Sequence, residues 1–260
     1  LVDPADLARA IDDRTLVVSI QLANNEIGTI QPVRELAAVT HARGALFHTD
    51  AVQAAGKAPV DVEELGVDLL TLSSHKLHGP KGVGALYVRK GVVLEPLVHG
   101  GRQEHGLRAG TENVAGIVGM GVAADRARHA LPGASAIGAL RDRLEEGVLG
   151  LLPSARRNGA RERCLPNTLS LTLPGLRGEA LVVAMDRHGV ALSSGSACKA
   201  GSPEPTHVLL AMGRTAEEAH CSVRFSLTRE TTAEDVETAL DALKTVLVEM
   251  ETTVRFLPCK

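Results

Sequence analysis

The chain has 260 residues, of which 44% are hydrophobic and 23% are charged, and its formal net charge is −3. This composition is typical of a globular protein with one large domain or two smaller ones. The charge balance excludes the basic surface that nucleic acids and anionic membranes require, and no apolar run approaches the roughly 18 residues of a membrane-spanning helix.

The first half of the chain alternates predicted strands with predicted helices. Four short apolar runs are typical of strands, and they lie at residues 15–20, 45–50, 68–74 and 84–88. The segment "PVRELAAVTHARG" at residues 32–44 has helical spacing, with Pro32 suited to the first turn and Gly44 to the C-terminal end. Strands and helices that alternate over short connections predict a mostly parallel sheet with helices on its faces.

Longer helical patterns begin near residue 111. Predicted helices lie at residues 111–131, 135–152, 178–189 and 232–250, and predicted strands lie at residues 168–173 and 220–227. The last helix has an apolar stripe formed by Val236, Leu240, Leu243 and Leu247. Thr231 and Glu234 are spaced as a capping box at its start. We expect an α/β protein in which residues 1–134 form the large domain and residues 135–260 form a smaller α+β domain.

Polar residues stand where three of the predicted strands end. Asn25 follows the first strand, Asp50 ends the second, and the third ends in "SSHK" at residues 73–76. In open parallel sheets, ligands bind beyond the carboxyl ends of the strands. Because an ordinary sheet does not require polar side chains at all three positions, we expect a ligand site at this edge.

Lys76 stands between the third strand and a glycine-rich turn, "HGPKGVG". A partly desolvated lysine at a strand end can act as an amine nucleophile and form a Schiff base with pyridoxal phosphate. That cofactor also needs a carboxylate at its pyridine nitrogen, for which Asp50 is placed, and phosphate donors, which Ser73 and His75 offer. Each of these residues alone is more often a solvated charge or a cap, so only their joint position favours a cofactor.

Four cysteines are spread along the chain without a CxxC pair, at Cys164, Cys198, Cys221 and Cys259. This spacing predicts neither a disulfide framework nor a zinc site, and it fits a reducing, cytoplasmic compartment. Cys221 lies in an apolar strand pattern and is typical of a small core residue. Cys198 lies in "SSGSACKAGSPEPTH", an exposed loop pattern in which Lys199 favours the thiolate. We expect Cys198 to be a nucleophile.

Arg224 lies between Val223 and Phe225 in a predicted strand. An arginine on a strand usually faces water, whereas one that faces inward needs a carboxylate partner. The carboxylate of a substrate would supply that partner, and Asn25 could add a neutral hydrogen bond.

These motifs resemble the cysteine desulfurases, pyridoxal-phosphate (PLP) enzymes of the class V aminotransferase superfamily. The matching segments are "NNEIGTIQP", "FHTDAVQAAGK", "SSHKLHGPKGVGALYV", "GGRQEHGLRAGTEN", "SSGSAC" and "SVRFSLTRETT", in family order over essentially the whole chain. The "SSGSAC" form is similar to group I, the nitrogen-fixation and iron–sulfur cluster assembly type. The resemblance implies a fold-type-I transferase, with the C-terminal part of the PLP-binding large domain at residues 1–134 and the catalytic cysteine in the small domain at residues 135–260.

The resemblance also implies roles in cofactor binding. The residues that would contact PLP are Asn25, Asp50, Gln53, Ser73, His75, Lys76 and Thr111. Lys76 would hold the cofactor covalently, Asp50 would pair with the pyridine nitrogen, and Gln53 would bind the ring hydroxyl. Thr111 would reach the phosphate of a partner subunit, which implies a homodimer.

For the reaction, the resemblance implies that Asn25 and Arg224 bind the carboxylate of L-cysteine. Cys198 would then accept the sulfur as a persulfide, with release of L-alanine, and Lys76 would move protons. The persulfide would pass to an acceptor scaffold protein for iron–sulfur cluster or thio-cofactor assembly in the cytoplasm.

One departure from the family pattern concerns the start of the chain. Family members carry a long segment before the position of Leu1, including a helix N-terminus that binds the phosphate and a histidine that stacks on the cofactor ring. We therefore expect a partial sequence that binds PLP weakly and turns over poorly by itself, unless the missing segment is supplied in trans. Two alternatives remain open: another class V PLP aminotransferase, or a non-catalytic truncated paralogue that acts as a binding module.

Overall fold

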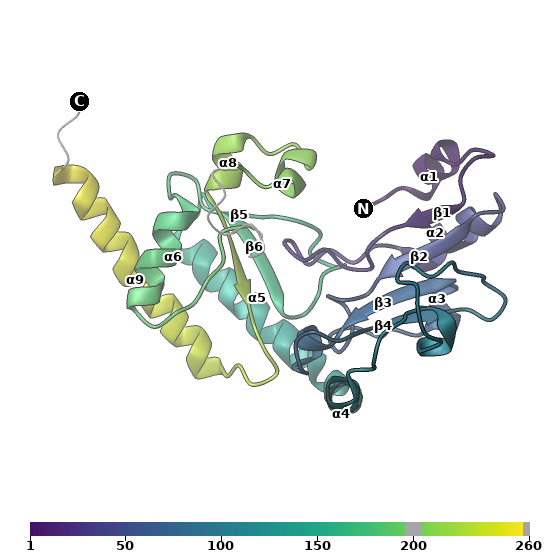
Figure 1. Cartoon of the computed structure of the whole chain (residues 1–260). Coiled ribbons are helices and arrows are strands. Elements are labelled where there is room, and N and C mark those ends of the chain that lie inside the picture. Colours follow the sequence, from purple (N-terminus) through teal and green to yellow (C-terminus); the bar gives the residue numbers. More distant parts are fainter. Residues whose placement is uncertain (196–203, 257–260) are drawn as a thin grey trace. The chain divides into compact units, whose positions relative to one another are not determined.

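The computed structural model describes residues 1–195 and 204–256, with side chains up to position 250. The chain divides into two compact units. The first comprises Leu1–Ala23 and Ile30–Pro132, and the second comprises Asn24–Thr29 and Gly133–Lys260 (Figure 1). A short segment from the beginning of the sequence therefore belongs to the second unit.

The first unit is built on a four-stranded sheet with the order β1-β2-β3-β4. Its strands are β1 (Val17–Ser19), β2 (Leu46–Asp50), β3 (Leu69–Ser73) and β4 (Gly84–Val88). The first three strands are parallel, and β4 runs antiparallel to β3. The prediction of a mostly parallel sheet is confirmed, although β1 is shorter than the apolar run at residues 15–20.

The helices of the first unit lie before, between and after these strands. They are α1 (Pro4–Ala10), α2 (Val33–His41), α3 (Val62–Leu65) and α4 (Val114–Ala130), with short 3-10 turns η1 (Ser74–Leu77), η2 (Glu104–Gly106) and η3 (Leu131–Gly133). The buried side chains of α2 are Val33, Leu36, Ala37 and Thr40. This spacing places them on one face, which explains why α2 packs on β2. As predicted, Pro32 stands at the start of α2.

The sheet of the first unit has one buried face and one exposed face. On β2, Phe47 and Thr49 are fully buried, whereas Leu46 and Asp50 point the other way. Leu46 pairs in register with Val17 of β1, and these two apolar side chains remain 36% and 48% exposed. The exposed face therefore carries apolar side chains as well as the polar strand ends.

The second unit is an α+β structure with an antiparallel sheet in the order β5-β6-β7. Its strands are β5 (Arg156–Arg157), β6 (Thr168–Thr172) and β7 (Ser222–Ser226). Its described helices are α5 (Ala134–Leu151), α6 (Gly178–Arg187), α7 (His207–Ala211), α8 (Ala216–His220) and α9 (Ala233–Phe256). Helix α5 contacts β6, α6 contacts β7, and both helices contact α9. Every residue of β6 is buried, so sheet and helices share one apolar core.

Helix α9 tests two of the sequence predictions. The apolar stripe is confirmed, because its members Val236 and Leu243 are buried and the other two pack against the same core. The predicted capping box of Thr231 and Glu234 is wrong. The reciprocal bonds lie one residue later: Thr232 N–H donates to Asp235 Oδ2 at 2.7 Å, and Asp235 N–H donates to Thr232 Oγ1 at 3.1 Å.

Candidate active site

Lys76 lies in η1, directly after the carboxyl end of β3. The strand continues into this turn because β4 pairs with β3 as far as Ser73, opposite Gly84. A Cβ at Gly84 would lie 2.6 Å from the carbonyl oxygen of Leu72, and one at Gly79 would lie 2.2 Å from Ser74 Oγ. The glycines therefore permit close backbone approaches on both sides of the turn, which fix the position of Lys76 after the strand.

Asp50 ends β2, the parallel neighbour of β3. It lies opposite Thr71 in the register, and its Oδ1 accepts a hydrogen bond from the backbone N–H of Val52 at 2.8 Å. The turn that follows carries Gln53. Since carboxyl ends of parallel strands meet at one edge of a sheet, Asp50, Gln53 and Lys76 lie at the same edge of the first unit.

Three further candidates, Ser73, His75 and Thr111, lie between the last residue of β3 and the start of α4. Ser73 Oγ and His75 Nδ1 lie 2.7 Å apart and share a hydrogen bond, which orients the imidazole. Thr111 is exposed in the segment before Asn113, which caps the N-terminus of α4. The first unit thus contains hydroxyl and imidazole donors together with the amine, the carboxylate and the amide.

The electrostatics of this edge involve a residue that the sequence did not indicate, Lys57. Its Nζ donates to the carbonyl oxygen of Gln53 at 2.9 Å. Burial, together with the charge of Lys76, lowers the pKa of Lys57 to about 8. Nearby, burial lowers the pKa of His48, while the charge of Asp50 opposes that shift. The amines of Lys57 and Lys76 therefore interact electrostatically beside the candidate site, and the charge on Lys76 disfavours a charge on Lys57.

The remaining described candidates, Asn25 and Arg224, lie in the second unit. Arg224 projects from β7, and its Nη1 donates to the carbonyl oxygen of Asn25 at 2.6 Å. Its Nε donates to Ser226 Oγ at 3.0 Å and its Nη2 to Ser193 Oγ at 3.3 Å. Arg224 is thus partly buried, and three of its contacts are to neutral oxygens. This geometry presents a guanidinium that a carboxylate could bind.

The structure therefore groups the sequence candidates in two sets. The first unit holds Asp50, Gln53, Ser73, His75, Lys76 and Thr111, and the second unit holds Asn25 and Arg224. Cys198 lies outside the described residues. Of the other cysteines, Cys221 is buried, as expected for a small core residue.

Comparison with known proteins identifies the family. A model of the family "Aminotransferase class-V" matches residues 1–239. The chain belongs to the class V aminotransferases. A "Cysteine desulfurase" of Gluconacetobacter diazotrophicus is 52% identical over 243 residues, which are 93% of this chain and 61% of that protein. The chain thus spans about three fifths of the length of this class V relative.

Solved structures give the same class V fold. A "NifS-like protein" matches with a TM-score of 0.87 at 40% identity, over 95% of this chain and 65% of that one. The structure of SspA in complex with cysteine matches with a TM-score of 0.70 at 33% identity, over 89% of this chain and 64% of that one. The expectation of a fold-type-I α/β architecture is confirmed.

Enzymes of the class V family depend on pyridoxal phosphate, and the first unit fits that group chemically. Its edge offers an amine for the aldehyde (Lys76), a carboxylate for the pyridine nitrogen (Asp50), and donors for the phosphate in Ser73 and His75. The described residues contain no cluster of three His, Cys, Asp or Glu side chains that could hold a metal ion.

Two features of this class V site had weak or absent signals in the sequence. Lys57 is four residues after Gln53, which suits a local hydrogen bond, but its burial depends on packing. Ser193 pairs with Arg224 across an isolated bridge between distant segments, and no local pattern predicts such a bridge.

No described helix is both long and apolar enough to cross a membrane.

Proposed function

We propose that the chain acts as a cysteine desulfurase, which removes sulfur from L-cysteine with the help of pyridoxal phosphate. The observation that carries the proposal is the placement of Lys76 and Asp50 after neighbouring parallel strands, in a chain that also contains the "SSGSAC" segment. The 52% identity to a protein named cysteine desulfurase supports the same chemistry. Domain roles follow: residues 1–134 bind the cofactor, and residues 135–260 carry Cys198.

The first unit would hold the cofactor. Lys76 binds the aldehyde carbon, Asp50 keeps the pyridine nitrogen protonated, and Gln53 binds the ring hydroxyl. The hydrogen-bonded pair of Ser73 and His75 binds the phosphate. When bound, the cofactor withdraws electrons from the bond to be broken in the substrate. Lys76 then moves protons at the substrate carbon, the role that the family resemblance implies.

The second unit would hold the carboxylate of L-cysteine. Arg224 can turn its guanidinium from neutral oxygens toward the substrate carboxylate, which accepts a stronger, charge-assisted hydrogen bond. Asn25 would add a neutral hydrogen bond to the substrate, and the family resemblance also gives it a role in cofactor binding. The known complex of SspA with cysteine supports cysteine as the ligand class.

The sulfur step takes place at Cys198. Its thiolate attacks the sulfur of the substrate, so that an S–S bond forms as the C–S bond breaks. The electron pair of the C–S bond stays with the carbon, which is protonated and leaves as L-alanine, and Cys198 keeps the sulfur as a persulfide. Atoms and charge balance without an external oxidant.

The persulfide would then pass to an acceptor protein for iron–sulfur cluster or thio-cofactor assembly. A homodimer in which Thr111 reaches the partner's phosphate belongs to the same proposal, as does a cytoplasmic location. We infer group I from the "SSGSAC" segment, because a long following segment allows one thiol to meet both substrate and acceptor.

The proposal is tested by measuring L-alanine released from L-cysteine by the purified chain with pyridoxal phosphate and a thiol reductant. We expect release above that of free cofactor, a persulfide on Cys198 by mass spectrometry, and loss of both in Cys198→Ala. Cys164→Ser is the matched control and should retain both.

Two results would favour the alternatives. Amino transfer that persists in Cys198→Ala would indicate an aminotransferase of the same family. A folded chain that binds no cofactor, tested alone and together with the N-terminal part of a relative that this chain does not cover, would indicate a binding module.

A further inference from the structure

The turn at Asn24–Thr29 is built into the second unit. The side chain of Asn24 accepts hydrogen bonds from two backbone N–H groups of the turn, at 2.8 and 3.0 Å. Gly28 has a φ of 72°, and a Cβ there would lie 2.8 Å from Cys164 Sγ. Because only glycine fits this approach without strain, the turn is held against the second unit in one conformation.

Glu26 is the buried carboxylate of this turn, with only 3% of its surface exposed. It accepts a hydrogen bond from the hydroxyl of Thr206 at 2.5 Å, and it has no ion-pair partner among the described residues. Burying a carboxylate without a cation is unfavourable, so its hydrogen bonds matter more than usual. Thr206 also caps α7, since its Oγ1 accepts from Val208 N–H at 3.3 Å.

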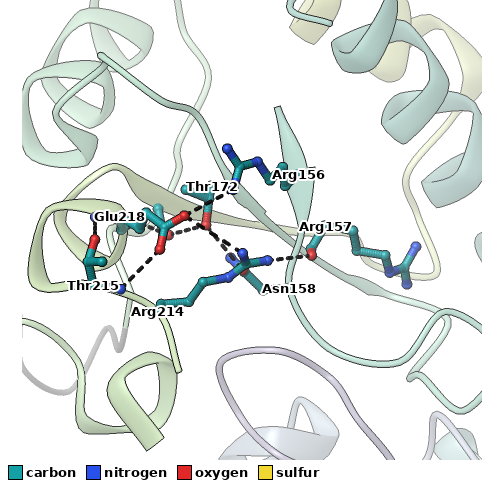
Figure 2. Close-up of polar contacts among 8 residues, drawn as sticks. Arg156, Arg157, Asn158, Thr172, Arg214, Thr215 and Glu218 are labelled. Atoms are coloured by element: carbon teal, nitrogen blue, oxygen red, sulfur yellow. Dashed lines mark hydrogen bonds and ion pairs between the residues drawn. The ribbon is translucent and has the colours of Figure 1, made fainter. Parts of the chain in front are cut away.

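Apolar and polar contacts hold the chain after Thr206. Ile27 of the turn packs with Leu209 of α7. Arg214, between α7 and α8, donates to Asn158 Oδ1 at 3.2 Å and to the carbonyl oxygen of Arg157 at 3.3 Å (Figure 2). The stretch that follows residue 203 is therefore fixed at both of its short helices.

The chain before residue 196 is held by backbone hydrogen bonds between Ser193 and Arg224 of β7. The N–H of Arg224 donates to the carbonyl oxygen of Ser193 at 2.7 Å, and the N–H of Ser193 donates back at 3.2 Å. Arg224 also binds the carbonyl oxygen of Asn25, so the chain before residue 196 is linked to Asn25 through Arg224. The chain after residue 203 is linked to the next residue, Glu26, through Thr206. The proposed carboxylate-binding residues thus coincide with the anchors of the segment that contains Cys198.

We propose that Glu26 is a positioning residue for sulfur transfer, because through Thr206 it fixes the described chain on the C-terminal side of Cys198. The inference rests on the proposed function of Cys198. Cys198 is five residues after Ser193, and five extended residues reach at most about 18 Å. Fixing the second end as well raises the effective concentration of the thiol at the bound substrate.

The first test measures the anchor without catalysis. Lysyl endopeptidase cleavage after Lys199 is followed in the PLP-loaded protein and in the protein without added cofactor, with cleavage after Lys81 as the internal reference. Thr206→Val, which keeps the shape but loses the hydroxyl, should be cleaved at least about fivefold faster after Lys199. Thr206→Ser keeps the hydroxyl and should behave as the wild type.

The second test measures sulfur transfer. Glu26→Ala and Thr206→Val should each lower kcat for alanine release about tenfold, with KM for L-cysteine changed less than about twofold. Glu26→Gln retains an acceptor oxygen for Thr206 and should recover most of kcat. The double variant should be no worse than either single variant, because both remove the same contact.

The outcomes separate the two proposals. Unchanged cleavage in Thr206→Val, or additive losses in the double variant, would overturn the role of Glu26. A wild-type protein that releases no alanine, even with the N-terminal part of a relative supplied, would contradict the proposed function instead, while the cleavage test would still report on the anchor. If Glu26→Ala does not fold, the comparison of Thr206→Val with Thr206→Ser decides alone.

Discussion

The two units bury their apolar side chains to different extents. In the second unit, Leu171 of β6 and Leu243 of α9 belong to one core and are fully buried. In the first unit, Leu86 of β4 is 50% exposed and Val118 of α4 is 61% exposed. The larger share of exposed apolar surface thus lies in the unit that carries Lys76.

The closed apolar core and the candidate cofactor-binding residues therefore lie in different units. The second unit has a core closed on both faces of β6, so it should be the more stable of the two. The first unit arranges the amine, the carboxylate and the phosphate donors on a sheet with one exposed face. Any ligand or packing partner that covers the exposed face also buries the site. The local stability of the site should therefore depend strongly on such ligands and partners.

The largest expected effect comes from the closed core. Leu171→Ala should lower the free energy of unfolding of the second unit by about 2–5 kcal/mol, because it leaves a cavity among fully buried side chains. Leu86→Ala is the matched control in the first unit and should cost less than about 1 kcal/mol, since half of that side chain is already exposed.

Hydrogen exchange followed by mass spectrometry resolves the two units and reports each free energy separately. Equal losses for Leu171→Ala and Leu86→Ala would contradict the difference between the cores.

A smaller effect is expected from Lys57 in the first unit. Its pKa is lowered to about 8 in the folded chain, chiefly by burial and then by the charge of Lys76. Between this pH and the ordinary lysine pKa, the unfolded chain binds more protons than the folded one. Stability should therefore rise with pH in this window, by at most about 1.4 kcal/mol per pH unit and less because Lys57 is partly exposed.

Urea unfolding at pH 8, 9 and 10 measures this slope. Lys57→Met should remove most of it. The same slope in both proteins would show that Lys57 keeps its proton in the folded chain.

The smallest effect concerns a helix cap in the second unit. Thr215 and Glu218 form a capping box at α8, in which each side chain accepts a hydrogen bond from the backbone N–H of the other. Thr215→Ala should lower the free energy of unfolding by about 1 kcal/mol. Thr215→Ser should keep it, as measured by thermal unfolding. A loss of equal size in the serine variant would attribute the effect to packing of the methyl group.

Much of the first unit could be predicted because its signals are local. Apolar runs separated by short connections define the parallel strands, and chain order then places Asp50 and Lys76 after neighbouring strands. The stripe on α9 was predictable for the same reason, since helical spacing alone defines a face.

Other features depend on contacts between distant segments. Thr231 with Glu234, and Thr232 with Asp235, both match the spacing of a capping box. The structure uses the second pair, while Thr231 Oγ1 accepts from Thr228 N–H at 2.9 Å. Likewise, no local pattern indicates that Glu26 meets Thr206, because that contact joins residues far apart in the sequence.

The turn at Asn24–Thr29 also bears on how such a chain can be inherited. The polypeptide passes from one unit to the other after residues 23, 29 and 132. A recombination event near residue 133 would transmit the helices and strands of the second unit but would leave behind Asn25 and Glu26. Any shuffled descendant would have to regain that loop from its new neighbour, so the two units are expected to be exchanged as a pair.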